Sequence, residues 1–200
     1  MKRLFDVVLS TAALIVTSPI VLVSAVAVKL ESRGPAFYSG TRVGKDGRSF
    51  RIHKLRTMRP ADSGLGVTAG DDPRITSVGR VLRRTKIDEL PQLYNVLKGE
   101  MSLVGPRPED PKYVAMYTPE QRSVLAVRPG MTGPAVLDFI DEEELLRGGD
   151  AESTYVTKVM PQKLEADLRY VQSASFGGDM RIIGRTLATI VARVFRRGSS

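Results

Sequence analysis

The sequence predicts an α+β protein: a mainly helical compact domain with a small β-hairpin, an N-terminal membrane helix and amphipathic helices at the membrane surface. Three features support this prediction. No charged residue occurs between Val7 and Val28, two alternating segments flank an Asp-Gly turn, and later segments repeat apolar residues at helical spacing. A chain of 200 residues suits one domain with a membrane element. We assign residues 1–30 to the membrane helix and residues 31–197 to a single cytosolic, membrane-associated domain.

The apolar run is compatible with three kinds of segment. Lys2-Arg3 and the small-x-small sequence Ala25-Val26-Ala27 would suit a cleaved signal peptide, but the run is longer than a usual signal core and Lys29 follows it directly. A helix of this length measures about 33 Å, so a spanning helix is the default interpretation. Because both flanks are basic, the positive-inside rule gives it no orientation.

Ser18 and Pro19 interrupt this run near its middle. Pro19 cannot donate a hydrogen bond to the Ile15 carbonyl and its ring crowds the preceding turn, so we expect a kink there. The Ser18 hydroxyl is placed to satisfy a carbonyl that the break leaves free. A kinked helix with both basic ends on one side of the membrane would be re-entrant. Kinked helices also span membranes, so these residues alone leave both topologies open.

The segments 36–43 and 48–55 alternate apolar and polar residues around Gly44-Lys45-Asp46-Gly47. This pattern predicts a β-hairpin with an Asp-Gly turn. The only histidine, His53, lies in the second segment, where we expect it on a strand face. The cations in and directly after the hairpin suit either a solvated face or a face toward phosphate; they are Arg42, Arg51, Lys54 and Arg56.

The rest of the chain is expected to be mostly helical. Residues 60–73 form an expected loop of a length that often has a function, such as that of a lid. A helix is predicted at 118–128, where Thr118 and Pro119 suit its first turn, and another at 160–172. We expect the acidic stretch 141–150 to be a solvated helix and turn.

The last predicted helix, Asp179–Arg197, has apolar residues on one face and arginines along its borders. This pattern is typical of a helix that lies on an anionic membrane surface, although a helix packed on a core with extended arginine side chains gives the same pattern. Gly198-Ser199-Ser200 is compatible with an expression scar.

The composition limits the chemistry. The net charge of +8 indicates an anionic partner, such as a membrane surface, a nucleotide or a nucleic acid. The chain has no cysteine and one histidine, which excludes disulfides, a cysteine nucleophile and a multi-histidine metal site. It has no tryptophan and its aromatic residues are dispersed, which disfavours nucleic-acid binding. Carboxylates, guanidinium groups and a hard cation such as Mg²⁺ remain.

Two adjacent carboxylates, Asp88 and Glu89, stand at the head of a short helical pattern. Its apolar face is predicted to consist of Leu90, Leu93, Tyr94 and Leu97. We expect the acid pair to be exposed at a helix start. Taken alone, such acids are ordinary capping residues. However, Arg83, Arg84 and Lys86 precede the pair, and acids at a helix start among cations suit the joint binding of a metal and a phosphate.

The wider string adds further motifs, which follow one another over most of residues 1–133. They are Asp72-Pro73-Arg74-Ile75-Thr76, Val78-Gly79-Arg80, Leu82-Arg83, Asp88-Glu89-Leu90-Pro91-Gln92-Leu93, Asn95-Val96-Leu97-Lys98-Gly99, Met101-Ser102, Gly105-Pro106-Arg107-Pro108, Arg128-Pro129-Gly130 and Thr132-Gly133. Together they closely resemble the bacterial sugar transferase family, in particular its small monotopic phosphoglycosyl transferases.

The resemblance implies a covalent mechanism. Asp88 would attack the β-phosphorus of a UDP-sugar, UMP would leave, and undecaprenyl phosphate would then take the sugar phosphate from Asp88. Both acids would contact Mg²⁺, and Glu89 would position the metal or handle a proton. The family's Ser-Pro break matches Ser18 and Pro19, which implies a re-entrant helix and a catalytic domain on the cytoplasmic face of the bacterial inner membrane.

The resemblance also implies phosphate-binding roles. Arg83 and Arg107 coincide with family positions, and the prolines beside Arg107 leave it few conformations to lose. The candidate phosphate- and nucleotide-binding residues are Lys54, Arg56, Arg83, Pro106, Arg107, Pro108 and Arg128. After Gly133 the chain departs from the Leu-Ala-Gln sequence common in the family, so the sugar is left unnamed.

Two rival functions belong to other classes. A non-catalytic membrane scaffold would use the acid pair as a helix cap and the apolar helix as an anchor, and a membrane-attached nucleic-acid binder would use the basic charge. A homodimer is left open.

Overall fold

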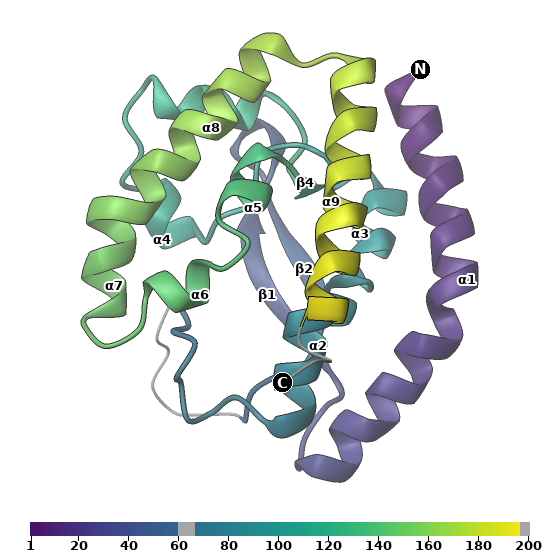
Figure 1. The fold of residues 1–200 in the computed structure, drawn as a ribbon. Helices are drawn as coiled ribbons and strands as arrows, with labels where there is room; N and C mark the ends of the chain where they lie inside the picture. The colour runs from purple at the N-terminus through teal and green to yellow at the C-terminus, as the bar shows by residue number, and fades with distance from the viewer. Residues whose placement is uncertain (60–66, 197–200) are drawn as a thin grey trace.

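The computed structural model describes residues 1–59 and 67–196. Its helices surround the long hairpin of β1 and β2 (Figure 1), which confirms the predicted α+β fold. The elements are α1 (Lys2–Glu31), β1 (Phe37–Val43), β2 (Ser49–Leu55), α2 (Ser77–Thr85), α3 (Gln92–Lys98), β3 (Ser102–Val104), α4 (Pro111–Val114), β4 (Gly130–Thr132), α5 (Pro134–Asp138), α6 (Glu142–Leu145), α7 (Ala151–Thr154), α8 (Met160–Ser173) and α9 (Phe176–Arg196). Short 3₁₀ helices cover Lys45–Gly47, Ile87–Glu89 and Gln121–Ala126, and a π-helical segment covers Tyr155–Val159.

The predicted hairpin is confirmed. β1 and β2 pair antiparallel from Phe37 opposite Leu55 to Val43 opposite Ser49. At the turn the φ angles of Asp46 and Gly47 are 57° and 74°, in the left-handed region that Asp and Gly tolerate best. The hairpin packs its buried residues Phe50 and Ile52 in a core cluster with residues of α3 and α8.

Helix α1 continues through Pro19 and bends about half way along its length (Figure 1). The Ser18 hydroxyl donates to the Ile15 carbonyl at 2.9 Å, which is the carbonyl that Pro19 leaves without its helical donor. The predicted role of Ser18 is therefore confirmed. Among the described residues α1 is the one helix long and apolar enough to cross a membrane.

The first turn of α1 is fixed to the rest of the domain by polar contacts. The Lys2 ammonium lies 2.5 Å from a carboxylate oxygen of Asp179 in α9. Arg3 donates to two carbonyls at the end of α3. The buried Asp6 carboxylate accepts the hydroxyl of Ser102 in β3 at 2.8 Å. The start of this apolar helix is thus attached to α3, β3 and α9.

The last turn of α1 is attached to the same domain. The Glu31 carboxylate accepts the backbone N–H groups of Ser77 and Val78 at 2.7 and 3.0 Å, and it thereby caps the start of α2. Arg56 donates to the carbonyl and hydroxyl of Ser32, directly after the helix. The buried residues of α1 lie near its two ends. Its middle part exposes large apolar side chains to the surroundings.

Strands β3 and β4 form a small parallel sheet that the sequence analysis does not predict. Ser102 lies opposite Gly130, and Val104 lies opposite Thr132. A Cβ on Gly130 would lie 2.1 Å from the backbone nitrogen of Gly105, so only glycine allows this approach of the two chains. The sheet places the turn that follows β3 beside the end of β4.

Helix boundaries confirm some sequence predictions and correct others. Helix α8 covers the predicted helix at 160–172 and α9 the predicted C-terminal helix. The segment predicted as a helix at 118–128 is instead a 3₁₀ helix that begins at Gln121, although Thr118 and Gln121 exchange the expected capping hydrogen bonds. Part of the predicted loop at 60–73, as well as residues 198–200, lies outside the described residues.

Gly130→Ala tests the approach of the two chains. The added methyl group forces backbone atoms apart, so we expect a loss of roughly 1–3 kcal/mol in the free energy of unfolding, measured by denaturation of the detergent-solubilised protein. Gly149→Ala is the matched control, because no atom lies within 4 Å of its Cβ position. Equal stability of the two variants would contradict the argument.

Candidate active site

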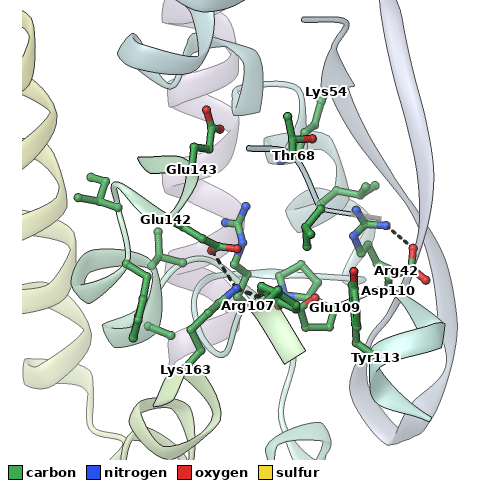
Figure 2. A pocket seen from close by; sticks show the side chains of 18 of the residues that line it. Arg42, Lys54, Thr68, Arg107, Glu109, Asp110, Tyr113, Glu142, Glu143 and Lys163 are labelled. Atoms are coloured by element: carbon green, nitrogen blue, oxygen red, sulfur yellow. Dashed lines mark hydrogen bonds and ion pairs between the residues drawn. The ribbon is translucent and has the colours of Figure 1, made fainter. Parts of the chain in front are cut away.

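A cleft of about 160 Å³ lies between β2, the turn after β3, and helices α5, α6 and α8. Figure 2 shows Arg107, Glu142 and Lys163 pointing toward one another from three different segments. Cationic residues outnumber acidic ones along its walls; the cations are Arg42, Lys54, Arg83, Lys86, Arg107 and Lys163, and the acids are Glu109, Asp110, Glu142 and Glu143. The cleft is therefore suited to an anionic ligand.

The acid pair lies in the 3₁₀ turn Ile87–Glu89 between α2 and α3. Our expectation of an exposed pair at a helix start is wrong, because Asp88 is only 7% exposed and α3 begins at Gln92. Pro91 lacks a backbone N–H group, so regular helical hydrogen bonding begins only after it.

This later start also changes the buried face of α3. Leu93 and Val96 are buried, whereas Tyr94, which the sequence analysis places on the apolar face, is half exposed. The buried face of α3 therefore includes Val96, which the sequence analysis does not predict, and does not include Tyr94. The Tyr94 ring packs near the ring of His53 instead.

Glu89 is held by two cations. Its Oε1 lies 3.0 Å from the ammonium of Lys54 and 3.5 Å from the guanidinium of Arg107. Burial alone would raise the pKa of Glu89, but the charges of Lys54 and Arg107, with Lys86, hold that pKa well below its usual range. Glu89 is thus an ionised carboxylate that joins β2 to the turn after β3.

Asp88 lies in a different environment. Its Oδ1 is buried and has no hydrogen-bond partner among the described residues. Burial, followed by the charge of Glu89, raises the pKa of Asp88 to about 6, while the cations nearby oppose the shift. Asp88 does not itself line the cleft; Lys86 and Gln92, on either side of the acid pair in the chain, do. Of the acid pair, Asp88 is the carboxylate with a buried oxygen free to bind or react.

The turn after β3 fixes the position of Arg107. Its flanking residues Pro106 and Pro108 are buried, and its backbone N–H donates to the buried Asp167 at 3.1 Å. The acids around its side chain, Glu89 first, outweigh burial and raise the pKa of Arg107 further above its usual value. The guanidinium is therefore charged and positioned beside Glu89.

Arg83 reaches the cleft from α2. Its guanidinium lies 2.6 Å from an oxygen of Glu143 and donates to the hydroxyl of Thr57 at 3.2 Å. The Glu143 side chain is 40% exposed, and ion pairs with such exposure contribute little to stability. A phosphate group can therefore replace Glu143 on Arg83 at a small cost.

Three of the predicted phosphate- and nucleotide-binding residues, Arg56, Pro106 and Arg128, do not line the cleft. The Arg56 guanidinium donates hydrogen bonds to the carbonyls of Arg33 and Ser32, directly after α1. Arg128 donates to the Gly99 carbonyl at 2.7 Å and does not line the cleft. The structure brings Lys54, Arg83, Arg107 and Pro108 to the cleft but leaves these two arginines outside it.

Lys163 is a residue of the cleft that the sequence analysis does not single out. It is buried in α8 and contacts Glu109, Glu142 and the hydroxyl of Tyr155 at 3.0–3.2 Å. A lysine beside Leu164 on the apolar face of a predicted helix was the available signal. The acidic stretch 141–150 is also more than a solvated helix, because Glu142 and Glu143 face the cleft and bind its cations.

The acid pair suits a partial binding site for a divalent cation. No cluster of three or more metal-binding side chains occurs among the described residues. Mg²⁺, however, is commonly held by one or two carboxylates, with water and substrate phosphates completing its shell. The free oxygen of Asp88 suits such a partial site, and Glu89 is adjacent in the chain.

Comparison with known proteins shows which family the chain belongs to. The family model for bacterial sugar transferases matches residues 1–193. A UDP-glucose:undecaprenyl-phosphate glucose-1-phosphate transferase of Caulobacter vibrioides is 42% identical over 95% of this chain and 69% of its own length. The exopolysaccharide production protein PSS of Rhizobium leguminosarum bv. phaseoli is 40% identical over 96% of both chains.

A third relative is longer than this chain. A UDP-N-acetylgalactosamine-undecaprenyl-phosphate N-acetylgalactosaminephosphotransferase of Aeromonas hydrophila is 38% identical over 95% of this chain, which spans only 43% of that protein. Taken together, these matches place the chain in the bacterial sugar transferase family. It is an enzyme of the transferase class.

Proposed function

We propose that this enzyme transfers a sugar 1-phosphate from a UDP-sugar to undecaprenyl phosphate and releases UMP. The observation that carries the proposal is the buried Asp88 oxygen without a partner among the described residues. Asp88 lies in the chain between Lys86 and Gln92, which line the cation-rich cleft, and the chain is related to transferases with these substrates. The reaction would be the first membrane step in the assembly of a bacterial glycan, such as an O-antigen, a capsule, an exopolysaccharide or a glycoprotein glycan.

In the first half-reaction an Asp88 oxygen attacks the β-phosphorus of the UDP-sugar. A carboxylate–phosphorus bond forms, the bond between that phosphorus and the oxygen bridging to the α-phosphorus breaks, and UMP leaves with the electron pair. Phosphoryl transfer depends mainly on charge neutralisation and alignment. Arg83, Lys54 and Arg107 supply cations along the cleft walls.

In the second half-reaction an oxygen of undecaprenyl phosphate attacks the same phosphorus and Asp88 leaves. The product is an undecaprenyl diphosphate sugar. Bound Mg²⁺ would neutralise phosphate charge at the acid pair. Asp88 and Glu89 would hold it. Because Glu89 is already paired with Lys54 and Arg107, we assign it mainly to positioning and Asp88 to attack.

We further propose that α1 is re-entrant, with the catalytic domain on the cytoplasmic face of the bacterial inner membrane. A spanning helix would carry its first turn about 30 Å from its last turn, to the opposite side of the membrane. Both ends of α1 are instead attached to one domain, through Lys2 at the start and Glu31 at the end. The exposed apolar middle of α1 and the arginine-bordered α9 would face the lipid.

The two rival functions are less consistent with these findings. A scaffold or a nucleic-acid binder would have no use for a buried carboxylate beside a cleft, and the relatives bear the names of sugar-phosphate transferases. A screen for UMP release from different UDP-sugars, with undecaprenyl phosphate as acceptor, tests the proposal and identifies the sugar.

Asp88→Asn should abolish UMP release, because an amide cannot form the acyl phosphate. We expect the thermal unfolding midpoint to stay close to that of the wild type or to rise, since the variant removes a buried charge without a partner. Asp46→Asn, in the hairpin turn and outside the cleft lining, is the control and should release UMP like the wild type. Normal turnover by Asp88→Asn would refute covalent catalysis by this residue.

Arg107→Lys keeps the charge but loses the planar fork that can bind two phosphate oxygens. A charge-assisted hydrogen bond is worth roughly 1.5–3 kcal/mol, so we expect kcat/KM to fall about ten- to hundredfold. Near-normal UMP release by both Arg107→Lys and Arg107→Ala would remove Arg107 from the site and leave the Asp88 proposal intact.

The topology can be tested by cysteine labelling, because the chain has no cysteine. A cysteine inserted directly after Met1 should react with a membrane-impermeant maleimide only after the inner membrane is permeabilised, as should the control Ser49→Cys in the hairpin. In Pro19→Ala the helix regains a backbone donor and straightens, so labelling from the periplasm should increase. Periplasmic labelling in the chain with Pro19 would contradict re-entry.

A further inference from the structure

Lys86 adopts an unusual backbone conformation at the entrance to the acid turn. Its φ angle is 58°, in the left-handed region, and its N–H group closes the end of α2 by bonding to carbonyls of Leu82 and Arg83. Glycine is the usual residue at such a helix end because it has no Cβ to crowd the backbone. A lysine here carries a conformational cost and places a positive charge at the site.

Lys86 also differs from the other cations that line the cleft. Each of those is paired with a carboxylate of the protein: Arg42 with Asp110, Lys54 and Arg107 with Glu89, Arg83 with Glu143, and Lys163 with Glu109 and Glu142. Lys86 makes no ion pair within the described part of the chain, although its side chain lines the same cleft. A phosphate that binds Lys86 therefore displaces no carboxylate of the described residues.

The position of Lys86 connects it to the reacting groups. It directly precedes the 3₁₀ turn that carries Asp88 and Glu89, and its charge acts on both of these acids. An ammonium group is a compact charge with three donors, which can follow a phosphate through different orientations. These properties suit a side chain that binds the phosphate group attacked by Asp88.

We propose that Lys86 is a substrate-binding residue whose ammonium group binds phosphate oxygens of the UDP-sugar diphosphate beside Asp88. The inference rests on the proposed function and extends it, because the sequence groups Lys86 only with other cations near the acid pair and gives it no role of its own. Arg83 and Arg107 must share or exchange their carboxylate partners when the diphosphate binds, whereas Lys86 has no ion-pair partner to give up among the described residues.

The test uses UDP, the part common to all UDP-sugar donors, as the probe. Its dissociation constant is measured by calorimetry on the full chain in detergent micelles with Mg²⁺. Lys86→Gly should weaken UDP binding roughly tenfold or more, the effect of losing one charge-assisted hydrogen bond. Arg84→Gln is the matched control, because Arg84 is an exposed cation of α2 outside the cleft lining, and it should bind UDP like the wild type.

A measurement of stability separates binding from a structural role. Glycine fits the left-handed backbone better than lysine, so the unfolding midpoint of Lys86→Gly should equal or exceed that of the wild type. Lys86→Asn, which also tolerates this conformation, should show the same loss of binding. Weaker UDP binding without loss of stability supports the proposal, and wild-type affinity in both variants overturns it.

The experiment also distinguishes this proposal from the proposed function. If the wild-type chain binds no UDP, the proposed function fails and Lys86 loses its substrate with it. If the wild type binds UDP and the Lys86 variants bind it equally well, only the role of Lys86 is refuted. A lower unfolding midpoint in both variants, with binding unchanged in the folded fraction, would assign Lys86 to the fold and would likewise overturn the proposal.

Discussion

The arrangement of the site depends on the ion pairs of Glu89. This carboxylate brings Lys54 of β2 and Arg107 of the turn after β3 to one point, although these segments are far apart in the sequence. Without the Glu89 carboxylate, the partly buried charges of Lys54 and Arg107 would face each other. Removing one partner of a buried ion pair costs stability, because it leaves the other charge uncompensated. The contact therefore aligns the acid turn, the hairpin and the proline-flanked turn around the cleft.

The same contact gives two adjacent acids different properties. Glu89 is stabilised as an anion by its partners, whereas burial and the charge of Glu89 raise the pKa of Asp88. Neighbouring titratable groups whose environments push their pKa values apart commonly take different catalytic roles. On this view Glu89 positions the cations that bind phosphate, and Asp88, which has a free oxygen, reacts. Lys86 lies at the entrance to the turn and supplies a charge that forms no ion pair within the described part of the chain.

The sequence predicts the features that depend on local patterns. The Asp-Gly hairpin, the compensation of Pro19 by Ser18 and the amphipathic α8 each follow from residues close together in the chain, and the structure confirms them. The sequence does not predict β3 and β4, because three-residue parallel strands have no periodicity and their pairing is non-local. It also misses Lys163, whose three partners come from separate segments, and it places Arg56 and Arg128 near a cleft that they do not line.

The central claim is that Asp88, and not Glu89, carries the sugar phosphate. The most direct measurement is peptide mass spectrometry of the protein, quenched shortly after it is mixed with Mg²⁺ and a UDP-sugar that it accepts as donor. Undecaprenyl phosphate is left out of this mixture. The account predicts a phosphosugar adduct on Asp88 that disappears when undecaprenyl phosphate is added. An adduct on Glu89 would contradict it, as would the absence of any adduct in wild-type protein that turns over the same UDP-sugar once undecaprenyl phosphate is supplied.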